Sequence, residues 1–143
     1  MKLHVPALIP EDYLPDITTR LVLYKRIAQA SNAEQLREIQ VEMIDRFGLL
    51  PEPVKNLFTA ALIKVRAQQL GIGEIDMTDE GGSIEFTAAT VVEPAAIVNL
   101  IQSDPLCYSL SGSGKLRVKK SLPTLSSRAE FVDALITPWL EAA

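Results

Sequence analysis

Four carboxylates recur at spacings of three and four residues in the first half of the sequence: Glu34, Glu38, Glu42 and Asp45. On an α-helix this spacing places them in one narrow stripe, opposite an apolar arc. Carboxylates that act as general acid and base need to converge in a pocket, whereas these would stand side by side on a convex surface. The spacing therefore favours a surface that binds a partner over a catalytic site.

Val41 falls at the edge of this acidic stripe, so an apolar side chain is expected beside the carboxylates, as in a small protein-docking patch. No lysine or arginine is interleaved at the centre of the stripe, although like charges four residues apart destabilise a helix by about 0.2–0.5 kcal/mol per pair. An ordinary solvated helix face is the alternative interpretation. The predicted partner-binding residues are Glu38, Val41, Glu42 and Asp45.

Basic residues alternate near the end of the sequence. Lys115, Arg117 and Lys119 are two residues apart, so on a strand all three project from one face, opposite Leu116 and Val118. Such a ridge is suited to phosphates or to an acidic partner surface. The alternative is the solvated side of a sheet, or an edge strand protected by lysines. No aromatic residue is interleaved, so base stacking is not expected.

Cysteine and histidine chemistry is limited by composition. The sequence has one cysteine, Cys107, and one histidine, His4, for which no partner is evident. A multi-thiolate zinc site and catalysis by Ser/His/Asp or Cys/His are therefore not expected. The short glycine repeats at residues 71–73 and 112–114 lack the lysine of a phosphate-binding loop and indicate turns. We predict no catalytic residue, no metal ligand and no cofactor.

The composition is that of one globular domain, with 143 residues, 48% hydrophobic and 22% charged. A formal charge of −4 argues against a dedicated nucleic-acid binder, because such proteins carry a basic excess. No apolar run approaches the roughly 18 residues that span a bilayer, and residues 1–6 lack the apolar centre of a signal peptide. We expect a cytoplasmic protein with no membrane contact.

Three helices are predicted in the first half of the chain. Residues 1–15 contain three prolines and indicate an extended lead-in. Helices are expected from Asp16 to about residue 30, over residues 33–47, and from the prolines at 51 and 53 to Gly71, because capping residues, prolines and glycines bound each apolar pattern. The apolar arc of the first helix contains Ile17, Leu21, Tyr24 and Ala28, flanked by Leu23 and Ile27.

The second half changes to the two-residue period of β-strands. Strands are predicted around residues 75–77 and 84–86, with Gly81 and Gly82 as their turn, and a helix follows from Pro94 to about residue 102. A second pair of strands is expected at 106–110 and 116–118, joined by a turn at Ser111-Gly112-Ser113-Gly114. A capping box at residues 127–130 opens the last helix.

The order of elements predicts an α+β fold. An N-terminal segment of three helices is followed by ββαββα, in which a four-stranded, mainly antiparallel sheet is packed by helices on one face. We predict one domain over residues 1–143, made of the lead-in at 1–15, the helices at 16–71 and the ββαββα segment at 72–143.

Two stretches resemble a known family. The sequence IPEDYLPD at residues 9–16 is followed by TRL at 19–21 and YKRIA at 24–28, and EMIDRFGLLP occupies residues 42–51. These strings resemble the C-terminal domain of the bacterial transcription-repair coupling factor (Mfd) over residues 3 to about 73. The remainder is similar only in the order of its elements, so no functional residue is carried over from that half.

The resemblance implies an autoinhibitory protein-interaction domain. In that family a motor protein binds stalled RNA polymerase, translocates on DNA with ATP, and recruits the excision-repair protein UvrA through a UvrB-like module. The C-terminal domain packs on that module, hides its UvrA-binding surface and restrains the translocase until polymerase is engaged. The resemblance further implies that the chain is a fragment of a larger motor protein and is not itself an enzyme. Its direct partner would be the intramolecular UvrB-like module, with UvrA, RNA polymerase and DNA as indirect partners.

The resemblance also gives the acidic stripe a partner. In the family the docking surface meets basic residues of the UvrB-like module, and the positions of Glu42 and Asp45 are where the matching carboxylates are expected. The alternative function is an accessory domain that contacts nucleic acid through Lys115, Arg117 and Lys119.

Overall fold

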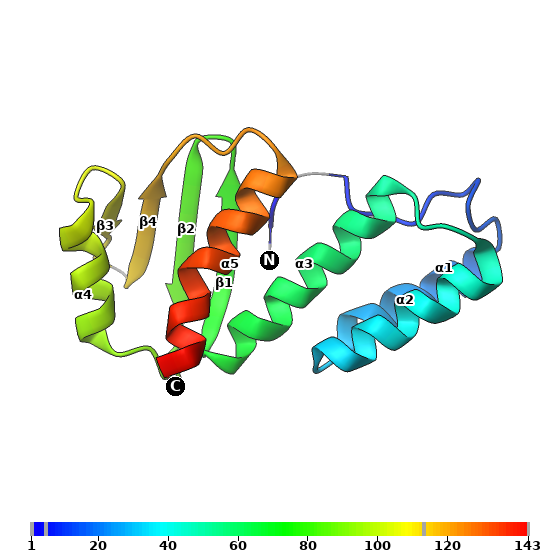
Figure 1. Ribbon diagram of the computed structural model, residues 1–143, viewed down its shortest axis with the longest axis horizontal. Helices are drawn as coiled ribbons and strands as arrows, with labels where there is room; N and C mark the ends of the chain where they lie inside the picture. The colour runs from blue at the N-terminus through cyan, green and yellow to red at the C-terminus, as the bar shows by residue number, and fades with distance from the viewer. Residues whose placement is uncertain (1, 5, 113, 143) are drawn as a thin grey trace. The chain divides into compact units, whose positions relative to one another are not determined.

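Five helices and four strands follow one another in the predicted order (Figure 1). The structure is a computed structural model that describes residues 2–4, 6–112 and 114–142, and these counts refer to those residues. The chain divides into two compact units, which we name the helical unit (residues 5–65) and the sheet unit (residues 1–4 and 66–143). The predicted α+β class is confirmed, and a single domain over the whole chain stays a prediction.

The helical unit contains α1 (Ile17–Gln29), α2 (Ala33–Phe47) and most of α3 (Glu52–Gln69). The predicted helix starts are confirmed by their caps: Asp16 accepts a hydrogen bond from the Thr19 amide, and Asn32 accepts one from the Gln35 amide. The residues of the lead-in contribute to this unit too. Ile9 and Leu14 are buried in it, and the Ile9 amide donates to the Tyr24 hydroxyl at 2.6 Å.

The prediction for the buried side of α1 was wrong for Ile17 and Leu21, whereas Tyr24 of the predicted arc packs against the core. Ile17 and Leu21 are 63% and 62% exposed, and Leu23 and Ile27 are the residues that enter the core. Both pairs are spaced by four residues, so helical periodicity fits either arc. Only the packing against neighbouring helices decides which arc is buried, and the other arc is left on the surface.

The elements of the sheet unit are β1 (Ile72–Thr78), β2 (Gly81–Phe86), α4 (Pro94–Ser103), β3 (Tyr108–Leu110), β4 (Lys115–Lys119) and α5 (Leu125–Ala142). The strands form a four-stranded antiparallel sheet in the order β1-β2-β4-β3. Alternation along the strands buries one face and leaves the other, here called the polar face, with the charged side chains. Helix α5 covers the apolar face (Figure 1). There the ring centroid of Trp139 lies 5.8 Å from that of Phe86.

The predicted turn at Gly81 and Gly82 was wrong, because both residues belong to β2 and the turn lies at residues 79–80. Glycine is required for a different reason. A Cβ on Gly82 would stand 1.8 Å from the Asp76 carbonyl oxygen, and one on Gly81 would stand 2.2 Å from that of Val118. The two glycines therefore let β2 lie close to both of its neighbours.

Two other boundaries in the sheet unit differ from prediction. Leu106 precedes β3 and is 90% exposed, so the third strand is shorter than expected. The box that caps α5 begins three residues early: the Ser127 amide donates to the Thr124 hydroxyl at 3.1 Å, and the Thr124 amide donates to the Ser127 hydroxyl at 3.0 Å. Residue 113 of the predicted turn at 111–114 lies outside the described residues.

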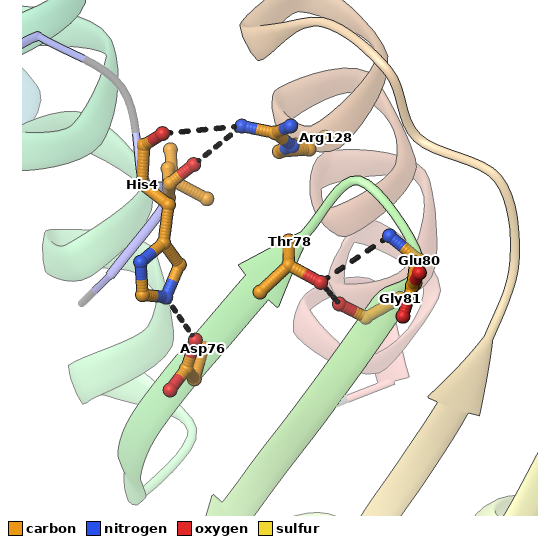
Figure 2. A network of polar contacts seen from close by, with 7 residues as sticks. His4, Asp76, Thr78, Glu80, Gly81 and Arg128 are labelled. Atoms are coloured by element: carbon orange, nitrogen blue, oxygen red, sulfur yellow. Dashed lines mark hydrogen bonds and ion pairs between the residues drawn. The ribbon is translucent and has the colours of Figure 1, made fainter.

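The first described residues add a short parallel pairing to β1, in which the Lys2 amide donates to the Ile75 carbonyl at 2.7 Å. His4 Nε2 lies 2.5 Å from Asp76 Oδ1 (Figure 2), which corrects the expectation that His4 has no partner. Arg128, only 7% exposed, donates to the carbonyls of Leu3 and Leu122. These carbonyls satisfy a buried guanidinium and fix the N-terminal segment to the sheet unit.

Candidate protein-interaction surfaces

The orientation of α2 is set by its buried side. Leu36, Ile39 and Met43 enter the core of the helical unit, which turns the opposite side of the helix to solvent. Glu38 and Asp45 are exposed there, and Val41 between them is 53% exposed. We call Glu38, Val41, Glu42 and Asp45 the acidic surface, since these are the residues that the sequence predicted to bind a partner.

Glu42 differs from the other members of the acidic surface because it is half-buried and paired within the helical unit. Its Oε2 atom accepts a hydrogen bond from Arg26 of α1 at 2.5 Å and lies 3.7 Å from Nη1 of Arg46. The hydrogen bond from Arg26, followed by the charges of both arginines, holds the pKa of Glu42 below its usual value. The counter-charge that α2 lacks within the stripe is thus supplied largely by α1.

Of the other three carboxylates in the stripe, one has an ion pair and two do not. Glu34 pairs with Arg37 on the next turn at 3.0 Å. Neither Glu38 nor Asp45 has an ion pair with any residue that the structure describes. Their charges are therefore free to attract a basic partner.

Apolar residues on the surface of the helical unit were missed by the sequence analysis. Ile17, Leu21 and Val22 of α1 are exposed, as is Ile44 of α2 at 40%. The sequence does contain a signal for this exposure. Helix α1 carries apolar residues on two arcs, and a surface helix usually buries only one of them. A hollow of about 250 Å³ also lies beside Glu38, lined by Arg26, Gln29, Ala30, Gln35 and Ile39.

The predicted basic residues lie along β4 on the polar face, but they are not equivalent. Lys115 lies opposite Glu85 in β2 and 4.0 Å from its carboxylate. Arg117 and Lys119 are exposed and line a hollow of about 420 Å³, which Lys115 does not reach. The structure therefore brings two of the three predicted cations together.

The described residues contain no group of three or more histidine, cysteine or acidic side chains placed to hold a metal ion. Within the same residues, no helix is long and apolar enough to cross a membrane. Cys107 is a free, half-buried thiol beside the hollow on the polar face.

Comparison with known proteins gives one consistent family. The model of the TRCF domain family matches residues 3–97. Transcription-repair-coupling factors of Escherichia coli K12 and Haemophilus influenzae are 42% and 43% identical over 132 and 136 residues, which are 92% and 95% of this chain. The chain spans 12% of the length of each of these relatives.

A crystal structure of the C-terminal domain of a transcription-repair coupling factor has the same fold. It superimposes with a TM-score of 0.80 over 99% of this chain and 90% of that one, at 23% sequence identity. The family model covers well over half of the chain, and the curated relatives match nearly all of it. The chain therefore belongs to the TRCF domain family and corresponds to the C-terminal domain of transcription-repair coupling factors.

Proposed function

We propose that this TRCF domain is an autoinhibitory interaction domain of a larger DNA-translocating repair protein. Its acidic surface docks on basic residues of a UvrB-like module in the same protein and covers the surface that recruits UvrA. The observation that carries the proposal is the joint exposure of Glu38, Val41 and Asp45 on one side of α2, with no ion pair between either carboxylate and a residue that the structure describes.

The proposed contact is weak enough to open reversibly. Exposed ion pairs contribute about 0.2–1 kcal/mol each, so two or three of them close an interface only weakly. Within one chain, however, a tethered surface meets its partner at an effective concentration of the order of 1 mM. A free dissociation constant of about 10 µM would then still favour the closed form roughly 100-fold. Engagement of RNA polymerase needs to supply only that modest free energy to release UvrA binding and the translocase.

Glu42 has a distinct part in the proposed interface. Arg26 and Arg46 both approach its Oε2 atom, and no hydrogen bond from a described residue reaches Oε1. An arginine of the partner could donate to Oε1 while Arg26 holds the side chain in place. Glu42 would therefore contribute a fixed acceptor, whereas Glu38 and Asp45 contribute mobile charge.

The test is the paired substitution Glu38→Lys and Asp45→Lys in the full-length protein. We expect UvrA binding without polymerase to rise about tenfold, because two attractive contacts become repulsive. Glu130→Lys with Glu141→Lys, which makes the same charge change at two exposed positions on α5 of the sheet unit, is the matched control and should leave UvrA binding unchanged. Circular dichroism of each variant checks folding. Unchanged UvrA recruitment by a folded double variant contradicts the proposal.

A further inference from the structure

A hollow of about 420 Å³ opens on the polar face of the sheet unit, far along the sequence from the acidic surface. Its floor is made of short side chains, because Gly81 and Ser109 occupy the strands on either side of β4. One wall is the turn between β1 and β2, where the Thr78 hydroxyl accepts from the Glu80 amide and donates to the Gly81 carbonyl (Figure 2). The other wall is the connection from α4 to β3 at residues 105–107.

Two unneutralised cations project beside this floor. Arg117 lies opposite Ser83 and Ser109, and Lys119 lies opposite Gly81, so no cross-strand neighbour carries a carboxylate. Neither cation has an ion pair with a residue that the structure describes, although the chain as a whole is acidic. On a strand their side chains start about 7 Å apart, which matches the spacing of alternate residues in an extended peptide.

The rim of the hollow adds an apolar contact. Leu106 is 90% exposed, the largest exposure among the large apolar residues of the described chain. Duplex DNA would use the two cations alone and would leave Leu106 without an apolar contact. A peptide that carries carboxylates and an apolar side chain on one side uses both the cations and Leu106.

We propose that this hollow binds an acidic, extended segment of a partner protein. Carboxylates two residues apart in that segment pair with Arg117 and Lys119, and an apolar side chain two residues beyond the carboxylate at Lys119, on the same side of the extended segment, packs on Leu106. The site lies wholly in the sheet unit and is independent of the docking proposed for α2. It gives the domain a second protein contact, of opposite charge to the first.

The first test measures binding of a fluorescein-labelled peptide, Glu-Ser-Glu-Ser-Leu, whose glutamates and leucine share one side when it is extended, to the whole chain at low salt. Arg117→Gln with Lys119→Gln should weaken binding about tenfold, since each exposed ion pair accounts for roughly two- to fivefold. Lys115→Gln is the matched control: it removes the same charge from the same face and strand, outside the hollow, and should change binding less than twofold. No peptide binding, or equal loss in both variants, overturns the proposal.

Two further measurements locate the peptide and separate it from nucleic acid. Cys107, the one cysteine of the sequence, lines the hollow, so saturating peptide should slow its reaction with a thiol reagent several-fold. Leu106→Ser should weaken peptide binding and leave any binding of a 20-base-pair duplex unchanged. Duplex binding that exceeds peptide binding and depends on the same two cations identifies a phosphate site and overturns the proposal. Asp45→Lys should leave peptide binding unaffected, so this test and that of the autoinhibitory function fail independently.

Discussion

The helical unit and the sheet unit neutralise their surface charges in different ways. On α2, a long arginine side chain from the neighbouring helix reaches Glu42, so the stripe predicted to be uncompensated is partly paired. On β4, the residues directly opposite are fixed by strand register, and only Lys115 meets a carboxylate. Helices exchange charges through long side chains, whereas strands depend on their immediate cross-strand neighbours. In the sheet, the residues opposite Arg117 and Lys119 are serine and glycine, so these two cations are left without a carboxylate across the strand.

The largest expected effects are losses of unfolding free energy, and they test whether the two units unfold independently. Ile84 in the sheet unit and Met43 in the helical unit are both fully buried, so either change to alanine should cost about 3 kcal/mol of unfolding free energy. Trp139 is the single tryptophan and reports on the sheet unit. We expect Ile84→Ala to lower the denaturant midpoint of Trp139 fluorescence more than Met43→Ala does. Equal shifts would show that the units unfold as one.

Arg128 should be the most costly charged side chain to remove from the sheet unit. Arg128→Leu leaves the buried carbonyls of Leu3 and Leu122 without their donors, at an expected cost of about 2 kcal/mol. Arg117→Leu, at an exposed arginine of the same unit, is the control and should change the free energy of unfolding by less than about 0.5 kcal/mol. Urea unfolding followed by Trp139 fluorescence measures both. A similar loss for the two variants would rule out the role given to the buried hydrogen bonds.

The smallest expected effect is the acid sensitivity of the pair between Arg26 and Glu42. Because the pKa of Glu42 is lowered in the folded state, the pair stabilises the fold above the unfolded carboxyl pKa of about 4.3 and loses this contribution as pH falls through the lower folded value. Glu42→Gln should therefore reduce stability at pH 7 by less than about 1 kcal/mol and flatten the acid limb of the stability profile.

Thermal melts between pH 2 and pH 7 measure this dependence. Glu38→Gln makes the same chemical change at a carboxylate outside the pair and serves as the control. An acid limb of Glu42→Gln as steep as that of the unsubstituted chain would mean that the pair does not stabilise the helical unit.

The features predicted well from the sequence are those governed by local chemistry. Asp16 and Asn32 cap helices because their side chains reach amides three residues away, and alternation along β4 separates Leu116 from Arg117. Contacts between residues that are distant in the sequence, in contrast, could not be predicted. The pairing of Arg26 with Glu42, the burial of Leu23 in place of Leu21, and the approach of Gly82 to Asp76 all depend on which elements become neighbours.

The hydrogen bonds from Arg128 to Leu3 join residues separated by 125 positions, with the whole helical unit in between. The sheet unit is thus discontinuous in the chain, and its two parts are connected through an inserted body of 61 residues, 5–65. During synthesis, the Leu3 carbonyl is made long before Arg128 of α5, the side chain that donates to it. Contacts of such long range slow folding, so the helical unit should mature first and the sheet unit should complete only after α5 has been synthesised.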